Sequence, residues 1–226
     1  ASAIAAVAYG TKKIRPVNKV IGPGNQFVSA AKKEVSGDIG IEAMTAGPSE
    51  VLIVADKSSN PEWLASDLLG QAEHDQLAQC ILISKDKNIL EKTKKEVFEQ
   101  LKNLPRSSIA KKSLMMNGIL IYANSDKKII EITNKIGPEH LELNVKNYKS
   151  FVAKIKNAGS VCLGKYAVMA MTDYGAPGSN HVLPTDSSSK YSSGLNVSEF
   201  MKKISYITLS KKGIDKLGPS AITLAN

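Results

Sequence analysis

Residues 51–84, VLIVADKSSNPEWLASDLLGQAEHDQLAQCILIS, contain two short apolar runs on either side of a helical pattern. The runs at 51–55 and 80–84 are rich in branched side chains and about five residues long, which is typical of buried strands. Between them, Asn60 and Pro61 form a strong helix start, because an Asn side chain caps the helix and Pro fits its first position. The strand, helix, strand order predicts parallel strands covered by a helix.

The same alternation continues on both sides of this stretch. It predicts helices and strands at residues 3–8, 19–21, 25–35 and 39–41 before it, and at 87–103, 119–122, 141–143, 148–157 and 160–163 after it, with a further helix capped by Ser125. We therefore expect an α/β fold with Rossmann-like layered sheets and helices on both faces. The second unit is expected to be more complete than the first.

The pattern divides the chain into three expected parts. Residues 1–49 form a partial nucleotide-binding-like half, residues 50–170 an α/β catalytic unit, and residues 171–226 a functional loop and the start of a helical tail. The run from about 172 to 198 is rich in Gly, Pro, Ser and Asn and too long for a simple connection, so it is either functional or disordered. Helical patterns return at 197–204 and 210–217, and another helix is expected to start at 224.

Composition restricts the classes of partner. The net charge is +9, but only Arg15 and Arg106 are Arg among 30 basic residues, and aromatic residues make up 5%. Nucleic-acid sites favour clustered Arg and stacking aromatics, so a solvated Lys-rich surface is the expected interpretation. The longest apolar runs, of about five residues, fall far short of the roughly 20 that cross a bilayer. We expect no nucleic acid and no membrane as partners.

The two cysteines and the first residues indicate in which cellular compartment the protein is expected. Cys80 and Cys162 both lie in apolar, strand-like runs and are interpreted as reduced core residues of a cytoplasmic protein. The opening run at 1–9 has neither a charged region nor an initiator Met, so we interpret it as a buried helix rather than a signal peptide. The sequence is expected to begin in mid-protein.

The first of three histidines lies near the end of the helix that starts at Pro61. Gln71 and His74 are three residues apart and share a helix face, so an amide oxygen and an imidazole can meet one ion. A Gln ligand is unusual for zinc, so the spacing alone favours a histidine that stabilises the helix end over a metal ligand.

The second histidine follows a carboxylate in a tight turn before a strand. Glu139 and His140 suit proton transfer, since His titrates near neutrality and a desolvated Glu can be tuned toward it. A charged surface turn is the alternative. The third, His181, closes a loop that starts at Asp173, whose oxygen can complement Gln71 and His74 in an open metal shell.

Two further turns are candidate binding elements. Residues 22–25, GPGN, lie between a strand and a helix, so their backbone amides can face an anion. A structural turn is an equal alternative, because the third glycine of a dinucleotide motif is replaced by Phe27. Ser49, in the run AGPSE at 46–50, precedes the strongest strand and can hydrogen-bond a substrate at a domain junction.

The order of these motifs resembles the histidinol dehydrogenase family over essentially the whole chain. The matching phrases are AIAA at 3–6, GPGN at 22–25, AGPSEV at 46–51, DLL and QAEH at 67–74, GPEHL at 137–141 and NHVLPT at 180–185. Six phrases in one order are far more specific than any one of them. The resemblance implies a zinc- and NAD-dependent enzyme that oxidises L-histidinol to L-histidine in two steps through an aldehyde, in histidine biosynthesis.

The resemblance also implies residue roles. Gln71, His74 and Asp173 would be zinc ligands, and the same three with Ser49 and His140 would bind the substrate. His140 would take the alcohol proton, and Glu139 would activate the water that hydrates the aldehyde. NAD would be contacted at two positions, Asn25 and Ser2.

Departures from the family pattern and rival functions limit this interpretation. Ser2 stands where the family commonly has Gln, residues 171–172 replace a Gly before Asp173, and the loop from 173 to 181 is one residue longer. The resemblance implies a homodimer, and it implies that the family's N-terminal portion and C-terminal tail are absent from this sequence. The alternatives are a related zinc- and NAD-dependent dehydrogenase of another small alcohol, such as a sulfonated diol, and a non-catalytic fragment that retains the fold.

Overall fold

The computed structural model of the chain describes residues 1–42, 47–174 and 180–226, without the side chain of Asp173. Residue 46 of the AGPSE motif and residues 175–179 of the glycine-rich loop lie outside this description. The chain divides into two compact units, Ala1–Leu195 and Asn196–Asn226. The three-part division expected from the sequence stays a prediction.

The first elements form a small two-stranded layer. They are α1 (Ser2–Tyr9), β1 (Lys19–Val20), α2 (Gln26–Glu34) and β2 (Gly40–Ile41), and β1 pairs in parallel with β2. Ile4, Ala8 and Val35 are buried together and join the helices. The four predicted elements are therefore present, each within a residue or two of its expected bounds.

The central sheet has five parallel strands in the order β5-β4-β3-β6-β7. Its strands are β3 (Glu50–Ala55), β4 (Gln79–Ser84), β5 (Gly118–Tyr122), β6 (His140–Asn144) and β7 (Ser160–Leu163). The chain runs outward from β3 to β5 and then returns to start β6 on the other side of β3. The boundary between β3 and β6 is therefore the switch point of a doubly wound sheet.

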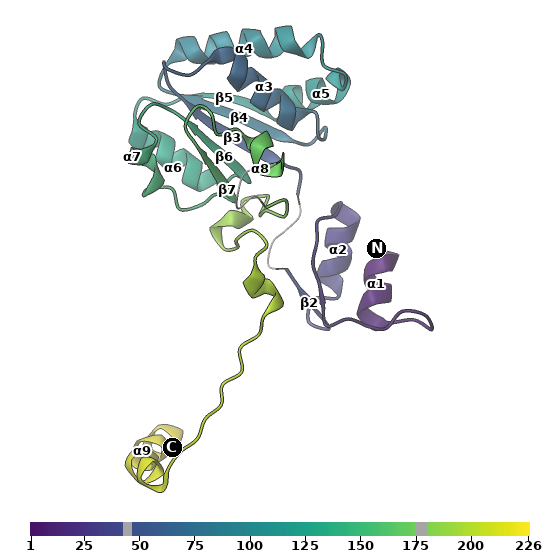
Figure 1. Cartoon of the computed structure of the whole chain (residues 1–226), viewed down its shortest axis with the longest axis vertical. Coiled ribbons are helices and arrows are strands. Elements are labelled where there is room, and N and C mark those ends of the chain that lie inside the picture. Colours follow the sequence, from purple (N-terminus) through teal and green to yellow (C-terminus); the bar gives the residue numbers. More distant parts are fainter. Residues whose placement is uncertain (43–46, 175–179) are drawn as a thin grey trace. The chain divides into compact units, whose positions relative to one another are not determined.

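Helices cover both faces of this sheet (Figure 1). One face carries α3 (Pro61–Ala72), α4 (Lys87–Leu101) and α5 (Ser107–Asn117), and the other α6 (Asp126–Ile136) and α7 (Lys149–Val152). Alternate residues of β3 serve the two layers, since Val51 and Ile53 join one buried cluster and Leu52 and Val54 the other. The predicted Rossmann-like α/β fold is confirmed.

One predicted helix is much shorter than expected. The pattern at 148–157 yields only the four residues of α7. After α7, the backbone groups of Lys154 and Lys156 are hydrogen-bonded to the side chain of Asn134 in α6 instead of to other residues of a helix. Asn134 Nδ2 donates to Lys154 O at 2.9 Å, and Asn134 Oδ1 accepts from Lys156 N at 2.7 Å. A side chain on another helix thus ends α7, which the local pattern cannot reveal.

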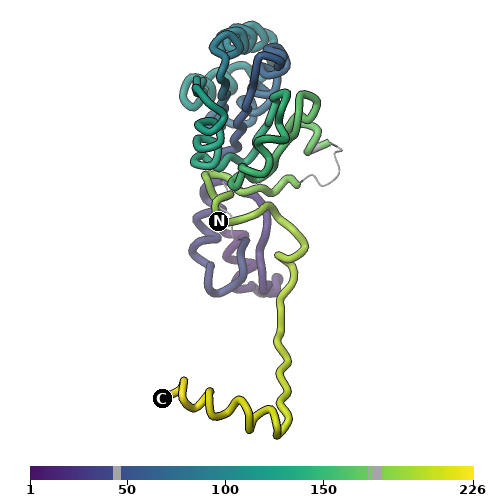
Figure 2. The backbone as a smooth tube through the Cα atoms, turned by 90° about the vertical axis from the view of Figure 1, so that its left-hand side faces the viewer, coloured from purple at the N-terminus to yellow at the C-terminus, as the bar shows by residue number. Residues whose placement is uncertain are grey.

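The second unit contains one short 3-10 turn, η2 (Val197–Phe200), and α9 (Lys211–Ala225), joined by an extended stretch (Figure 2). The helix predicted at 197–204 is wrong, because Met201 already has extended backbone angles. The helix predicted from 210 begins where expected, with Ser210 as its cap, but runs on through Pro219 to Ala225. Among the described helices of the whole chain, none has the length and apolar character to span a membrane.

The carboxyl edge of the sheet is closed at the switch point. Lys146 N donates to Asp56 Oδ2 at 2.9 Å, and Ser59 Oγ donates to Asn144 O at 2.6 Å, so the turns after β3 and β6 are bound to each other. Burial acts to raise the pKa of Asp56, but hydrogen bonds from Ser58 and Lys146 outweigh it and the pKa is lowered. Ligands of open parallel sheets usually bind at this edge. Here five of the residues singled out from the sequence lie at the opposite, amino edge: Ser49, Gln71, His74, Glu139 and His140.

Candidate functional site

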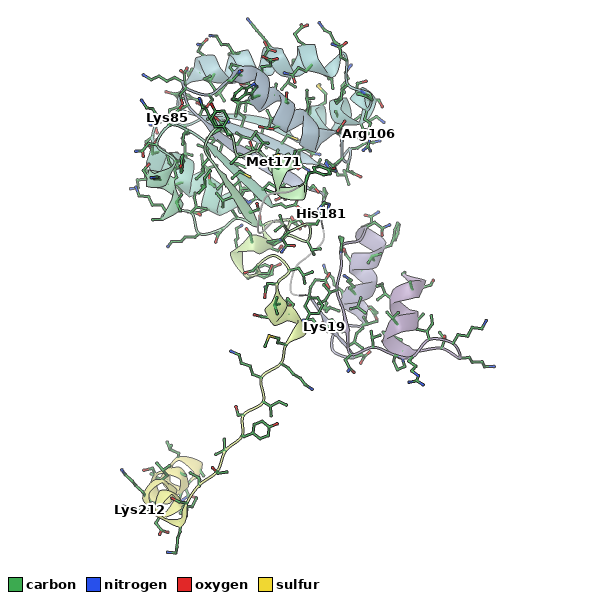
Figure 3. The ribbon with its side chains drawn as sticks, in the orientation of Figure 1. Lys19, Lys85, Arg106, Met171, His181 and Lys212 are labelled. Atoms are coloured by element: carbon green, nitrogen blue, oxygen red, sulfur yellow. The ribbon has the colours of Figure 1, made fainter. Side chains whose placement is uncertain are left out.

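A pocket of about 100 Å³ lies at the amino edge, where β3 and β6 begin and α3 ends. Its lining contains residues from several separate stretches of the chain. These are Ser49, Gln71, His74, Glu139, His140, Met169, Asn180 and His181. Figure 3 labels His181 and, on α8 (Met169–Tyr174), Met171. The structure thus brings Ser49, Gln71, His74, Glu139 and His140 to one pocket, while the roles assigned to them stay predictions.

The end of α3 contributes Gln71 and His74. Gln71 is the penultimate residue of the helix and 1% exposed, whereas His74 is exposed and lies in the turn that follows, its N–H donating to Gln71 O at 3.2 Å. The Arg106 guanidinium donates to His74 O at 3.4 Å. A cation from the residue before α5 therefore already serves this helix end, and His74 lines the pocket.

Gln71 carries an unsatisfied polar atom. Within the described residues, its buried Nε2 has no hydrogen-bond partner. A buried polar atom without a partner lowers the free energy of unfolding by roughly 1–3 kcal/mol. Rotation of the amide exchanges Nε2 with Oε1 and would direct an acceptor oxygen to the same place. An oxygen that lacks a donor there is suited to a cation, so Gln71 fits the ligand role expected of it.

Glu139 is fixed by reciprocal bonds with the start of β3. Glu50 N donates to Glu139 Oε2 at 3.0 Å, and Glu139 N donates to Glu50 Oε2 at 3.3 Å. Asp186 N donates to the other oxygen of Glu50 at 3.1 Å. Burial raises the pKa of Glu50, and these backbone donors oppose the rise. The carboxylate of Glu139 is thereby held with Oε1 on the side of His140.

Glu139 and His140 form a close acid and imidazole pair. Glu139 Oε1 lies 3.7 Å from His140 Nε2, and the residues are 7% and 8% exposed. The pair follows Gly137, which ends α6 in the left-handed region at φ 62. Because both side chains are buried, the turn is not the charged surface turn that the sequence left open. A desolvated carboxylate beside an imidazole is an arrangement that can move protons.

The segment after residue 180 is bound to both sides of the pocket. Gly47 N donates to Thr185 Oγ1 at 2.6 Å, and Ser189 Oγ, in η1 (Ser188–Lys190), donates to Gly137 O at 2.9 Å. These bonds carry Asn180 and His181 to the pocket, residues to which sequence reasoning assigned no role. The signals for them were that His181 is one of only three histidines and that both residues open the phrase NHVLPT at 180–185.

The remaining predicted residues lie elsewhere or outside the description. Asp173 belongs to α8, but its side chain is not described, so its place at the pocket stays a prediction. Ser2 begins α1, and Asn25 caps α2 by accepting from Phe27 N and Val28 N at 3.1 Å each. The amide nitrogen of Asn25 is not used by this cap. It can donate to a ligand at the GPGN turn.

No group of three His, Cys, Asp or Glu side chains suited to a metal ion occurs among the described residues. The expected zinc ligands do not form such a group, because Gln71 is an amide and the Asp173 side chain is not described. Gln71 with its unsatisfied nitrogen and His74 on the same pocket are the two members that fit. Their oxygen and nitrogen donors are types that zinc accepts.

Neither cysteine is suited to nucleophilic chemistry. Cys80 and Cys162 are 2% and 6% exposed, and burial raises the pKa of each thiol to about 12. Thiolate is the reactive form, so it is scarce at neutral pH.

We expect both cysteines to resist alkylation in the folded protein. Treatment with iodoacetamide at pH 8, followed by mass spectrometry, should leave both thiols unmodified under native conditions and modify both after denaturation. Rapid native labelling of either one would contradict the burial that we assign to it.

The geometry can be compared with known proteins. The model of the histidinol dehydrogenase family matches residues 1–226. Curated histidinol dehydrogenases from Pelagibacter ubique and Zymomonas mobilis are 74% and 45% identical over 225 residues, which cover 100% of this chain and 52% of each relative. The crystal structure of histidinol dehydrogenase from Elizabethkingia anophelis superimposes with a TM-score of 0.92 at 43% identity, covering 99% of this chain and 51% of that one. The chain thus spans about half the length of the relatives it matches.

Proposed function

The chain belongs to the histidinol dehydrogenase family, and from this premise we propose that its pocket is part of the site for the zinc- and NAD-dependent oxidation of L-histidinol to L-histidine, in histidine biosynthesis. The observation that carries the proposal is the buried Glu139–His140 pair in one pocket with Gln71, His74 and Ser49. A homodimer in the cytoplasm is the proposed state of the protein.

Zinc would be held by Gln71, His74 and Asp173. When bound, zinc supplies a fixed positive template for the amino and imidazole nitrogens of the substrate. Ser49, just before β3, would hydrogen-bond the same substrate from its own side of the pocket. Asn25 and Ser2 would contact NAD, which accepts a hydride in each oxidation.

The two oxidations place different demands on the protein. Loss of hydride from an alcohol requires loss of its hydroxyl proton, and His140 is the proposed acceptor. The aldehyde must then add water to become a gem-diol before the second hydride leaves, and Glu139 is the proposed base for that water. Glu139 Oε2 is engaged by Glu50 N, so Oε1 is the atom assigned to this step. Two adjacent bases therefore serve two steps that one base serves poorly.

The reaction itself tests the proposal. The intact protein, supplied with zinc, NAD and L-histidinol, should convert each histidinol to histidine with formation of two NADH, at a rate on the order of 10 per second. Chromatography of the product together with NADH absorbance gives both quantities. Turnover of another small alcohol, such as a sulfonated diol, without turnover of histidinol would assign the site to a related dehydrogenase instead. No turnover of any alcohol by folded, zinc-loaded protein would support a non-catalytic role.

A further inference from the structure

Two carboxyl groups interact with each other on residues that have no part in the proposed chemistry. Glu142, in the middle of β6, is 1% exposed, and Asp67 lies on α3. Glu142 Oε2 and Asp67 Oδ2 are both buried, and neither has a hydrogen-bond donor among the described residues if both groups are ionised. Two acceptors cannot satisfy each other, but a single proton between them makes a hydrogen bond.

The surroundings favour one proton on the pair. Burial raises the pKa of Glu142 well above its ordinary value, and the charge of Asp67 raises it further. Burial also raises the pKa of Asp67, to about 6, opposed by the hydrogen bond from Glu142. Near neutral pH, Glu142 therefore keeps its proton and donates it to the Asp67 carboxylate. Cys162, opposite Glu142 in the neighbouring strand β7, adds no cation.

The second oxygen of Glu142 is already engaged. Met169 N, at the start of α8, donates to Glu142 Oε1 at 2.9 Å. The N–H group of Met169 directs its hydrogen at Glu142 Oε1, so a cation bound to the same oxygen is disfavoured. The pair is therefore a hydrogen-bonded link rather than a second metal site.

This link joins the elements that carry the pocket residues. On α3, Asp67 and Gln71 are four residues apart, the spacing of one helix face, and His74 follows in the turn after the helix. On β6, His140 and Glu142 alternate and so share the face toward α3. Met169, bonded to Glu142, itself lines the pocket.

We propose that Asp67 and Glu142 are positioning residues, whose carboxyl–carboxylate hydrogen bond, together with the bond to Met169, holds α3, β6 and α8 where the pocket is formed. Neither residue is assigned a contact with the substrate. The inference rests on the proposed function for its catalytic consequence only. The link itself is a property of the fold and can be measured separately.

Two substitutions of Glu142 in the intact protein separate a hydrogen-bonding role from a charged one. In Glu142→Gln, Oε1 still accepts from Met169 and Nε2 donates to Asp67, so the link persists. Glu142→Leu keeps a similar volume and removes both bonds. We expect Glu142→Leu to raise the hydrogen-exchange rate of the Met169 amide at least about 10-fold. It should also weaken zinc binding by roughly 10- to 100-fold, as loss of the groups that support metal ligands does. Glu142→Gln should remain within about 3-fold of the wild type in both.

The measurements are hydrogen exchange at Met169, zinc affinity by competition with a chelating dye, and kcat and KM for L-histidinol, all well below the melting temperature. Equal losses in Glu142→Gln and Glu142→Leu would overturn the inference, because an ionised Glu142 would then be required. Unchanged exchange and zinc affinity in Glu142→Leu would also overturn it. If even the wild type binds no zinc, the proposed function fails, while exchange at Met169 in the three proteins still decides the link.

If a variant does not fold, the protonated carboxyl group can still be observed directly in the wild type. The infrared spectrum of the wild type near neutral pH should contain the carbonyl band of a buried carboxylic acid, and Glu142→Gln should lack it. Absence of that band from the wild type would show that the pair carries no proton and would overturn the inference.

Discussion

Replacing Glu139 by Gln in the intact protein is expected to slow oxidation of the aldehyde by roughly 100- to 10,000-fold, the usual contribution of a general base. Oxidation of the alcohol should fall much less, because the proposed proton acceptor of that step is His140 and not Glu139. The amide oxygen introduced by Glu139→Gln can still accept from Glu50 N, so the substitution removes the base while the turn stays in place. Stopped-flow measurement of NADH from alcohol and from aldehyde separates the two steps.

The matched variant is His140→Asn, which removes the neighbouring imidazole and leaves Glu139 intact. It should impair oxidation of the alcohol strongly. Equal losses in both half-reactions for Glu139→Gln, or a loss confined to the alcohol, would contradict the separate roles assigned to the two residues.

Removal of either proposed zinc ligand whose side chain the structure describes is the second large effect that we expect. His74→Ala and Gln71→Ala should each weaken zinc binding by more than about 100-fold, since loss of outer contacts alone costs roughly 10- to 100-fold. Turnover should fall in parallel, and should recover in part at high zinc concentration because binding follows mass action.

The control for this prediction is Glu73→Gln, next to His74 but not among the residues that line the pocket. It should bind zinc as the wild type does. Zinc affinity measured by isothermal titration after removal of bound metal with a chelator compares the three variants. Tight binding retained by both His74→Ala and Gln71→Ala would exclude this pocket as the zinc site.

The centre of the sheet was predictable because β3 is apolar on both faces. Leu52 and Ile53 are buried under opposite helical layers, so β3 appears in the sequence as a continuous apolar run. The end of α7 was not predictable, because Asn134 binds the backbone after it from another helix. Local patterns carry no information about such a partner.

The candidate site was likewise predictable only in part. Four site residues could be found from the sequence, because their side chains can transfer protons or bind a metal and lie close together in the chain. They are Gln71 with His74 and Glu139 with His140. The pair of Asp67 and Glu142 could not be found in this way, although each lies at helical or strand spacing from a pocket residue. The partnership spans α3 and β6, and only the folded chain brings the two carboxyl groups together. The closure of the carboxyl edge was likewise a contact between distant turns.

The central claim, that the pocket at the amino edge of β3 and β6 holds zinc, is tested most directly by anomalous X-ray diffraction. Crystals of the intact protein grown with zinc would be measured on both sides of the zinc absorption edge. We predict an anomalous peak in this pocket, about 2.0–2.2 Å from the side-chain oxygen of Gln71 and from a ring nitrogen of His74. A peak elsewhere, or none in protein that binds zinc tightly in solution, would contradict it.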